Sequence, residues 1–74
     1  MTRAEPRDVA IRDETIRLGQ LLKLAGVVES GGEARELIQD GAVRVNGEVD
    51  RRRGRQLRAG DVVQAAGERL RVIV

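Results

Sequence analysis

Arginine is the residue type in this sequence with the clearest capacity for chemistry, since it supplies thirteen of the fourteen basic residues. Six arginines fall between residues 41 and 60 against two acids, and four of them share one short run, Arg51-Arg52-Arg53-Gly54-Arg55. A guanidinium binds phosphate through a bidentate fork and can stack on a base, which an ammonium cannot do. A local cationic patch is typical of nucleic-acid binders, although such a run also occurs as a solvated loop. The block therefore predicts a surface that binds a polyanion.

Side chains that act as nucleophiles, general bases or metal ligands are scarce. The sequence contains no Cys, His or Tyr and a single lysine, Lys23. Its hydroxyl groups belong to three residues, Thr2, Thr15 and Ser30. Nucleophilic catalysis and thiolate or imidazole metal sites therefore have almost no candidates. Acids are plentiful, but those at residues 33, 36 and 40 have the helical spacing of a solvated face. We expect no catalytic residue, no metal and no cofactor, and a chain that is not an enzyme.

The absence of Phe, Tyr and Trp limits how this chain could read RNA. Unpaired bases are usually held by stacking on aromatic side chains, at about 1–3 kcal/mol per base. Here only arginine planes could stack in that way. We therefore expect recognition of phosphate spacing and of the shape of folded or helical RNA, with little base specificity.

The stretch from Ser30 to Gly47 should position much of this charge. Ser30 and Glu33 have the spacing of a capping box, which predicts a helix that begins directly after Ser30. Gly41 suits the left-handed residue that follows a helix, so this helix should end near Asp40.

A short strand and a tight turn should follow this helix. Val43-Arg44-Val45 alternates like a half-buried strand, and Asn46-Gly47 is the strongest short-range signal for a two-residue hairpin. Such a turn places Val49 opposite Arg44 rather than beside the buried valines. The return strand should therefore contain a bulge or depart early, and the sequence leaves both open.

A first helix and a second hairpin complete the predicted fold. Leu18, Leu21, Leu22 and Ala25 form one helical stripe, and Gly26 is a good terminator. Residues 62–65 and 69–74 read as strands around a turn at residues 66–67. The fold class predicted is α+β, with a two-helix αL hairpin packed on a small, mostly antiparallel sheet of about four short strands.

The chain length corresponds to one domain. Residues 1–14 are expected to form a flexible tail, with at most one short extended piece near residues 9–11, and residues 15–74 to form the domain. No apolar run approaches the ~20 residues of a transmembrane helix, and residues 1–12 lack the apolar region of a signal peptide. A cytoplasmic monomer is the default expectation.

The order of these pieces resembles a known family. The segments Ile16-Arg17-Leu18, Val28-Glu29-Ser30, Glu33-Ala34-Arg35, Val43-Arg44-Val45-Asn46-Gly47 and Gly60-Asp61-Val62 are similar to the S4-like RNA-binding domain with its αL motif. That domain occurs in small-subunit ribosomal protein four, bacterial tyrosyl-tRNA synthetases and many pseudouridine synthases. The similarity covers residues 15–74 and is greatest to the small stand-alone YbcJ-like bacterial proteins. It implies a partner in structured RNA, either rRNA or tRNA, and an association with ribosomes.

The resemblance also implies that RNA lies across the first helix, the start of the second helix and the following strand. The positions that correspond are Arg17, Ser30, Arg35, Arg44 and Asn46. Basic residues nearby add charge to this surface, namely Lys23, Arg51, Arg52, Arg53 and Arg55. Simpler roles exist for three of these residues: Ser30 as a helix cap, Asn46 as a turn residue and Arg17 as an ion-pair partner of a nearby acid. Many relatives carry a basic residue directly after the serine, where this chain has Gly31-Gly32.

Two other functions are compatible with the same residues. The acidic N-terminal half or a sheet edge could dock a partner protein. The chain could also act as an accessory RNA-targeting domain for an RNA-modifying enzyme supplied in trans.

Overall fold

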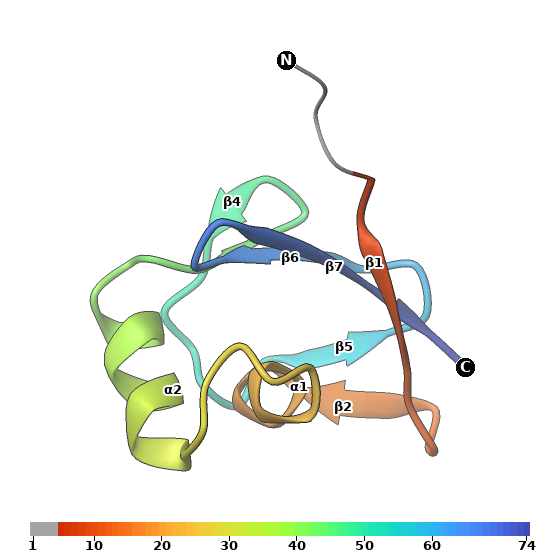
Figure 1. The fold of residues 1–74 in the computed structure, drawn as a ribbon, viewed down its shortest axis with the longest axis horizontal. Coiled ribbons are helices and arrows are strands. Elements are labelled where there is room, and N and C mark those ends of the chain that lie inside the picture. The colour runs from red at the N-terminus through yellow and green to blue at the C-terminus, as the bar shows by residue number, and fades with distance from the viewer. Residues whose placement is uncertain (1–4) are drawn as a thin grey trace.

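Two layers enclose the core in the computed structural model, which describes residues 5–74. The elements in chain order are β1 (Arg7–Ala10), β2 (Thr15–Arg17), α1 (Leu18–Leu24), α2 (Gly31–Gln39), β3 (Arg44–Val45), β4 (Glu48–Val49), β5 (Gln56–Arg58), β6 (Val62–Ala65) and β7 (Glu68–Ile73). One layer is a five-stranded sheet in the order β1-β7-β6-β3-β4. Figure 1 shows α1, α2 and the separate β2–β5 pair on one side of that sheet. The predicted α+β class is confirmed, with five strands in the main sheet rather than about four.

Both helices begin and end where the sequence predicts. α1 starts at Leu18, and α2 starts directly after Ser30. Each helix is followed by a glycine with positive φ, +75° at Gly26 and +77° at Gly41, as expected for a left-handed end. Within residues 5–74, neither helix is long and apolar enough to cross a membrane.

The start of α2 has a modified form of the predicted capping box. The Ser30 Oγ accepts a hydrogen bond from the backbone N–H of Glu33 at 3.1 Å. The Glu33 carboxylate accepts from the backbone N–H of Glu29 at 2.6 Å, one residue before the expected donor. Two backbone donors at this helix entry are therefore satisfied locally.

Both predicted hairpins are present with two-residue turns. Asn46-Gly47 has φ values of +52° and +89°, and Ala66-Gly67 has +52° and +78°, the positive pair that such turns require. Arg44 is paired with Val49, which is 42% exposed. Neither a bulge nor an early departure occurs: the Asp50 N–H still donates to the Val43 carbonyl at 3.0 Å, so the regular register of the turn continues and leaves Val49 exposed.

The sheet extends further toward the N-terminus than residue 15. β1 runs parallel to β7, with Arg7 paired to Leu70 and Ala10 to Ile73. Val9 and Ile11 are both 7% exposed and belong to the core. The short extended piece expected near residues 9–11 is thus a strand of the main sheet. The part of the expected tail over residues 1–4 lies outside the described residues.

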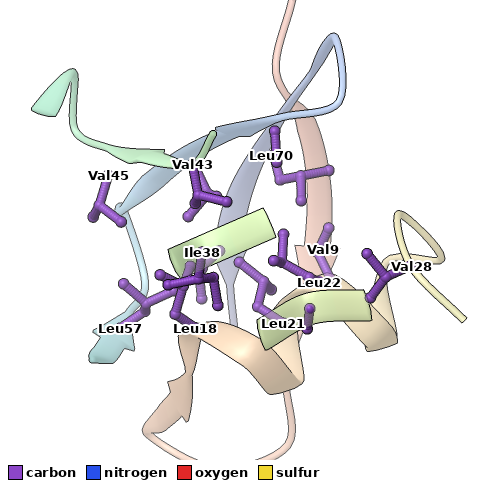
Figure 2. Close-up of a cluster of buried hydrophobic side chains, with 14 of the residues drawn as sticks. Val9, Leu18, Leu21, Leu22, Val28, Ile38, Val43, Val45, Leu57 and Leu70 are labelled. Carbon is purple, nitrogen blue, oxygen red and sulfur yellow. The ribbon is translucent and has the colours of Figure 1, made fainter. Parts of the chain in front are cut away.

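Aliphatic side chains alone make the core between the two layers. α1 contributes Leu18, Leu21 and Leu22, which have no exposed surface. α2 contributes Ile38, and β5 contributes Leu57 from the opposite end of the layer. Figure 2 shows these side chains converging with those of the main sheet. The dense packing fixes the relative positions of α1, α2 and the loop before β5, where most of the predicted binding residues lie.

Candidate nucleic-acid interface

Four of the predicted binding residues line one groove between α1, the start of α2 and the arginine-rich loop. They are Arg17, Lys23, Arg35 and Arg53. The groove, which we call the α1–α2 groove, has a volume of about 470 Å³. Its remaining lining residues are small or uncharged: Gly19, Gln20, Gly31, Gly32, Ala34 and Gly54. Segments from three different parts of the chain therefore deliver positive charge to one concave surface.

The positive charge of the α1–α2 groove is not compensated locally. No acidic residue is among those that line it. All four cationic side chains are exposed, and none forms an ion pair within the part of the chain that the structure describes. The alternative role of Arg17 as a partner of a nearby acid is thus not adopted in this structure. Clefts lined by charge of one sign concentrate their field, which favours binding of an anionic ligand.

Backbone hydrogen bonds fix Arg53 beside α1. The N–H groups of Leu18 and Gly19 begin α1 and donate to the carbonyl oxygens of Arg55 at 2.8 Å and Arg53 at 3.1 Å. The arginine-rich loop thereby satisfies two of the donors that every helix N-terminus leaves free. A Cβ atom at Gly19 would lie 3.0 Å from the Arg53 Cγ, so a glycine allows this close approach. Gly19 was not identified as a site residue from the sequence. The signal that could have found it is a glycine within the predicted first helix, where glycine is unfavourable unless another segment must approach closely.

The start of α2 presents its backbone to the same groove. Gly31 and Gly32 line the groove, and a Cβ at Gly31 would meet no atom within 4 Å. Their two N–H groups have no acceptor among residues 5–74. A helix N-terminus carries partial positive charge and free donors, which suits an oxyanion. The diglycine at the start of α2 thus leaves the backbone open to a ligand.

Two other arginines of the run are instead neutralised by a buried acid. Asp50 is only 6% exposed and forms ion pairs with Arg52 at 2.9 Å and Arg55 at 2.7 Å. Its carboxylate also accepts from the Arg52 backbone N–H at 2.9 Å. These bonds, those of Arg52 foremost, hold the pKa of Asp50 far below its usual range despite burial, and Asp50 raises the pKa of Arg52. We call these three residues the Asp50 cluster. The sequence predicts both arginines on the binding surface, whereas the structure pairs both with Asp50.

Arg51 lies at the opposite end of α2 from the groove. A Cβ at Gly41 would come within 2.6 Å of the Arg51 Nη2, which places this guanidinium against the residue that ends the helix. A cation there interacts favourably with the negative end of the helix dipole. The four arginines of the run therefore point to three places: Arg53 to the groove, Arg51 to the end of α2, and Arg52 and Arg55 to Asp50.

The remaining candidates have local structural partners. Ser30 caps α2, as described above. The Asn46 side chain donates to Asp61 Oδ1 at 3.1 Å and accepts from the Val62 N–H at 2.9 Å, so it joins its turn to β6. Arg44 is exposed on β3 and donates from Nη1 to the Gly47 carbonyl at 3.2 Å. Neither Arg44 nor Asn46 lines the α1–α2 groove.

Comparison with known proteins places this arrangement in context. A model of the S4 domain family matches residues 9–73, which is most of the chain. The probable ribosome maturation protein RlbA of Bacillus subtilis is 51% identical over 59 residues, which cover 80% of this chain and 83% of RlbA. The putative RNA-binding protein YbcJ of Escherichia coli is 40% identical over 58 residues, covering 78% of this chain and 83% of YbcJ.

A solved structure extends the likeness to the whole fold. The solution structure of E. coli YbcJ superposes with a TM-score of 0.73 at 32% sequence identity, and the match covers all of this chain and 96% of that one. That structure is described as revealing an αL motif involved in RNA binding. The two helices of the αL hairpin are the ones that form the α1–α2 groove here.

Proposed function

The chain belongs to the S4 domain family, and from this premise we propose that it binds structured RNA without catalysing a reaction. The proposed partner is ribosomal RNA or tRNA, bound in the cytoplasm during ribosome maturation. RlbA, described as a probable ribosome maturation protein, and YbcJ, described as a putative RNA-binding protein, support this proposal as relatives of similar length.

The observation that carries the proposal is the uncompensated charge of the α1–α2 groove. Arg17, Lys23, Arg35 and Arg53 surround the free N–H groups at the start of α2. Guanidinium, ammonium and backbone donors all suit phosphate oxygens. Since the chain has no aromatic side chain, the groove would bind the RNA backbone and recognise its shape.

This mode of binding predicts a steep dependence on salt. Four phosphates neutralised by the groove should give a slope of log affinity against log salt of about −3.6 on a duplex, at about −0.9 per contact. A filter-binding or fluorescence-anisotropy titration of an RNA hairpin between ~50 and ~200 mM salt measures this slope. An affinity that does not change with salt would contradict an electrostatic groove.

Substitutions of Ser30 separate its role as a cap from a direct role in RNA binding. Ser30→Ala should lower the free energy of unfolding by about 1 kcal/mol, because the Glu33 N–H loses its acceptor, and should change RNA affinity little. Ser30→Asp should keep the cap and the stability, but weaken RNA binding several-fold by placing a negative charge beside the groove. Denaturant unfolding and anisotropy titrations of both variants provide the two readouts. Loss of affinity in Ser30→Ala with unchanged stability would instead make the hydroxyl an RNA contact.

A further inference from the structure

The face of the main sheet that points away from the helices carries two further arginines that form no ion pair within residues 5–74, Arg44 and Arg69. Along β3, β6 and β7 the residues facing the core are buried, and Arg44, Gln64 and Arg69 alternate with them. Their side chains therefore project from the opposite face of the sheet, with the helices on the other side (Figure 1).

Strand register brings these three residues into one row. Gln64 on the central strand is paired with Arg44 of β3 and with Arg69 of β7. Directly paired residues on one face have their Cβ atoms about 5 Å apart, so Gln64 lies between the two arginines. The three residues line a depression of about 350 Å³ together with Ala42 and the second hairpin turn. We call this surface the outer-face row.

The outer-face row differs from the other arginines of the sheet in having no carboxylate partner. Arg71 is paired with Asp8 at 2.8 Å, and Arg7 is paired with Glu68 at 2.9 Å. Glu68 also lines the depression, but this ion pair engages its carboxylate. Within residues 5–74, no ion pair involves Arg44 or Arg69.

Arg69 has a polar atom without a hydrogen-bond partner, which favours binding of an anion at this surface. Its Nε is buried and has no hydrogen-bond acceptor within the described part of the chain. Buried donors in native proteins are nearly always satisfied, and leaving one without a partner costs about 1–3 kcal/mol. A small rotation of the Arg69 side chain would expose this Nε to an oxyanion in the depression, which would supply the acceptor. Arg44, whose Nη1 donates to the Gly47 carbonyl at 3.2 Å, would contribute its remaining guanidinium donors from the neighbouring side of Gln64.

We propose that the outer-face row binds a phosphate of a second RNA segment, so that the domain bridges two strands held on opposite faces. The inference depends on the proposed function, because it takes RNA as the source of the phosphate. The charge of the row favours a polyanion, and phosphate offers the bidentate geometry that a guanidinium fork matches. Arg44, predicted from the sequence as part of one surface with the groove, belongs to this second site.

The phosphate site can be tested without RNA. In ¹H–¹⁵N spectra, the Nε–H resonance of Arg69 should shift on titration with inorganic phosphate, and Arg44→Gln should reduce the shift several-fold. Arg35→Ala/Arg53→Ala, altered only in the groove, should retain the response, as should Arg71→Gln in the neighbouring row. Absence of the shift, or a shift unchanged by Arg44→Gln, would overturn the proposal even if the groove binds RNA.

A second set of experiments tests the same site with RNA. Arg44→Gln/Arg69→Gln should reduce the slope of log affinity against log salt on a folded RNA by about 1.8, for two contacts at about 0.9 each.

A capture experiment tests the bridging of two strands. Beads that carry one RNA hairpin and are loaded with wild-type protein should capture a second, labelled hairpin. The Arg44→Gln/Arg69→Gln variant should remain bound to the first hairpin but should not capture the second. A phosphate response in Arg69 without capture by the wild type would show an anion site and overturn the bridging of two strands. Failure of the wild type to bind the first hairpin would be failure of the proposed function itself.

Discussion

Arg35→Ala/Arg53→Ala is expected to weaken RNA binding by about 30-fold at low salt, corresponding to about 1 kcal/mol for each lost guanidinium–phosphate contact. The two residues approach the α1–α2 groove from α2 and from the arginine-rich loop, and neither has an ion-pair partner in residues 5–74. The salt slope should also become shallower by about 1.8. Anisotropy titrations at several salt concentrations measure both effects.

A matched variant separates loss of the groove from loss of charge. Arg12→Ala/Arg58→Ala also removes two exposed arginines, and neither of them lines the groove. This control should lose only a few-fold in affinity, through the long-range field. The groove variant should keep its melting temperature within a few degrees, because the backbone carbonyl of Arg53, which satisfies the start of α1, remains in place. Equal losses of affinity in the two variants would mean that net charge, and not the groove, determines binding.

Asp50→Asn is expected to have the largest effect on stability among substitutions between β4 and β5. The carboxylate anchors two guanidinium groups and one backbone N–H, and it is almost fully buried. Loss of its charge should cost about 2–3 kcal/mol, less than a fully buried pair because Arg52 is largely exposed. For a domain of this size, the melting temperature should fall by roughly 10–20 °C. Thermal and denaturant unfolding at neutral pH measure the loss.

The lowered pKa of Asp50 sets the pH range of this effect. Because the folded pKa lies below the ordinary value of 3.8, the cluster contributes its full stability above that value. The contribution is lost as the pH falls through the folded pKa. The stability gap between the wild type and Asp50→Asn should therefore be constant near neutral pH and narrow in strong acid. Glu48→Gln, an exposed acid with no ion pair among residues 5–74, serves as the control, and an equal loss in that variant would contradict the cluster.

Features specified by neighbouring residues could be predicted from the sequence. The ends of α1 and α2, the Ser30 cap and the turn at Asn46-Gly47 depend on side chains within a few positions of the backbone that they stabilise. Local hydrogen bonding and the need for positive φ determine such features, so a short sequence window contains the information.

Features that join distant segments could not be predicted in the same way. The arginine run appeared to be one cationic surface, but the fold places Gly19, Gly41 and the buried Asp50 beside different members of it. Which carboxylate neutralises which arginine depends on tertiary contacts that residue spacing does not encode. For the same reason the sequence placed Arg44 on one surface with the groove and did not indicate Gln64 or Arg69, since only the strand register brings these three residues together.

The parallel pairing of β1 with β7 has a consequence for the order of assembly. It joins positions 63 residues apart, as in the contact of Asp8 with Arg71, whereas both hairpins join residues that are close in the chain. Contacts between near neighbours close first, since closing a longer loop costs more entropy. Until β1 pairs with it, β7 is an open sheet edge that contains the apolar residues Leu70 and Val72. Before β1 pairs, the open edge of β7 can also accept β1 of another molecule. Exchange of this strand between two molecules is therefore the expected form of misassembly.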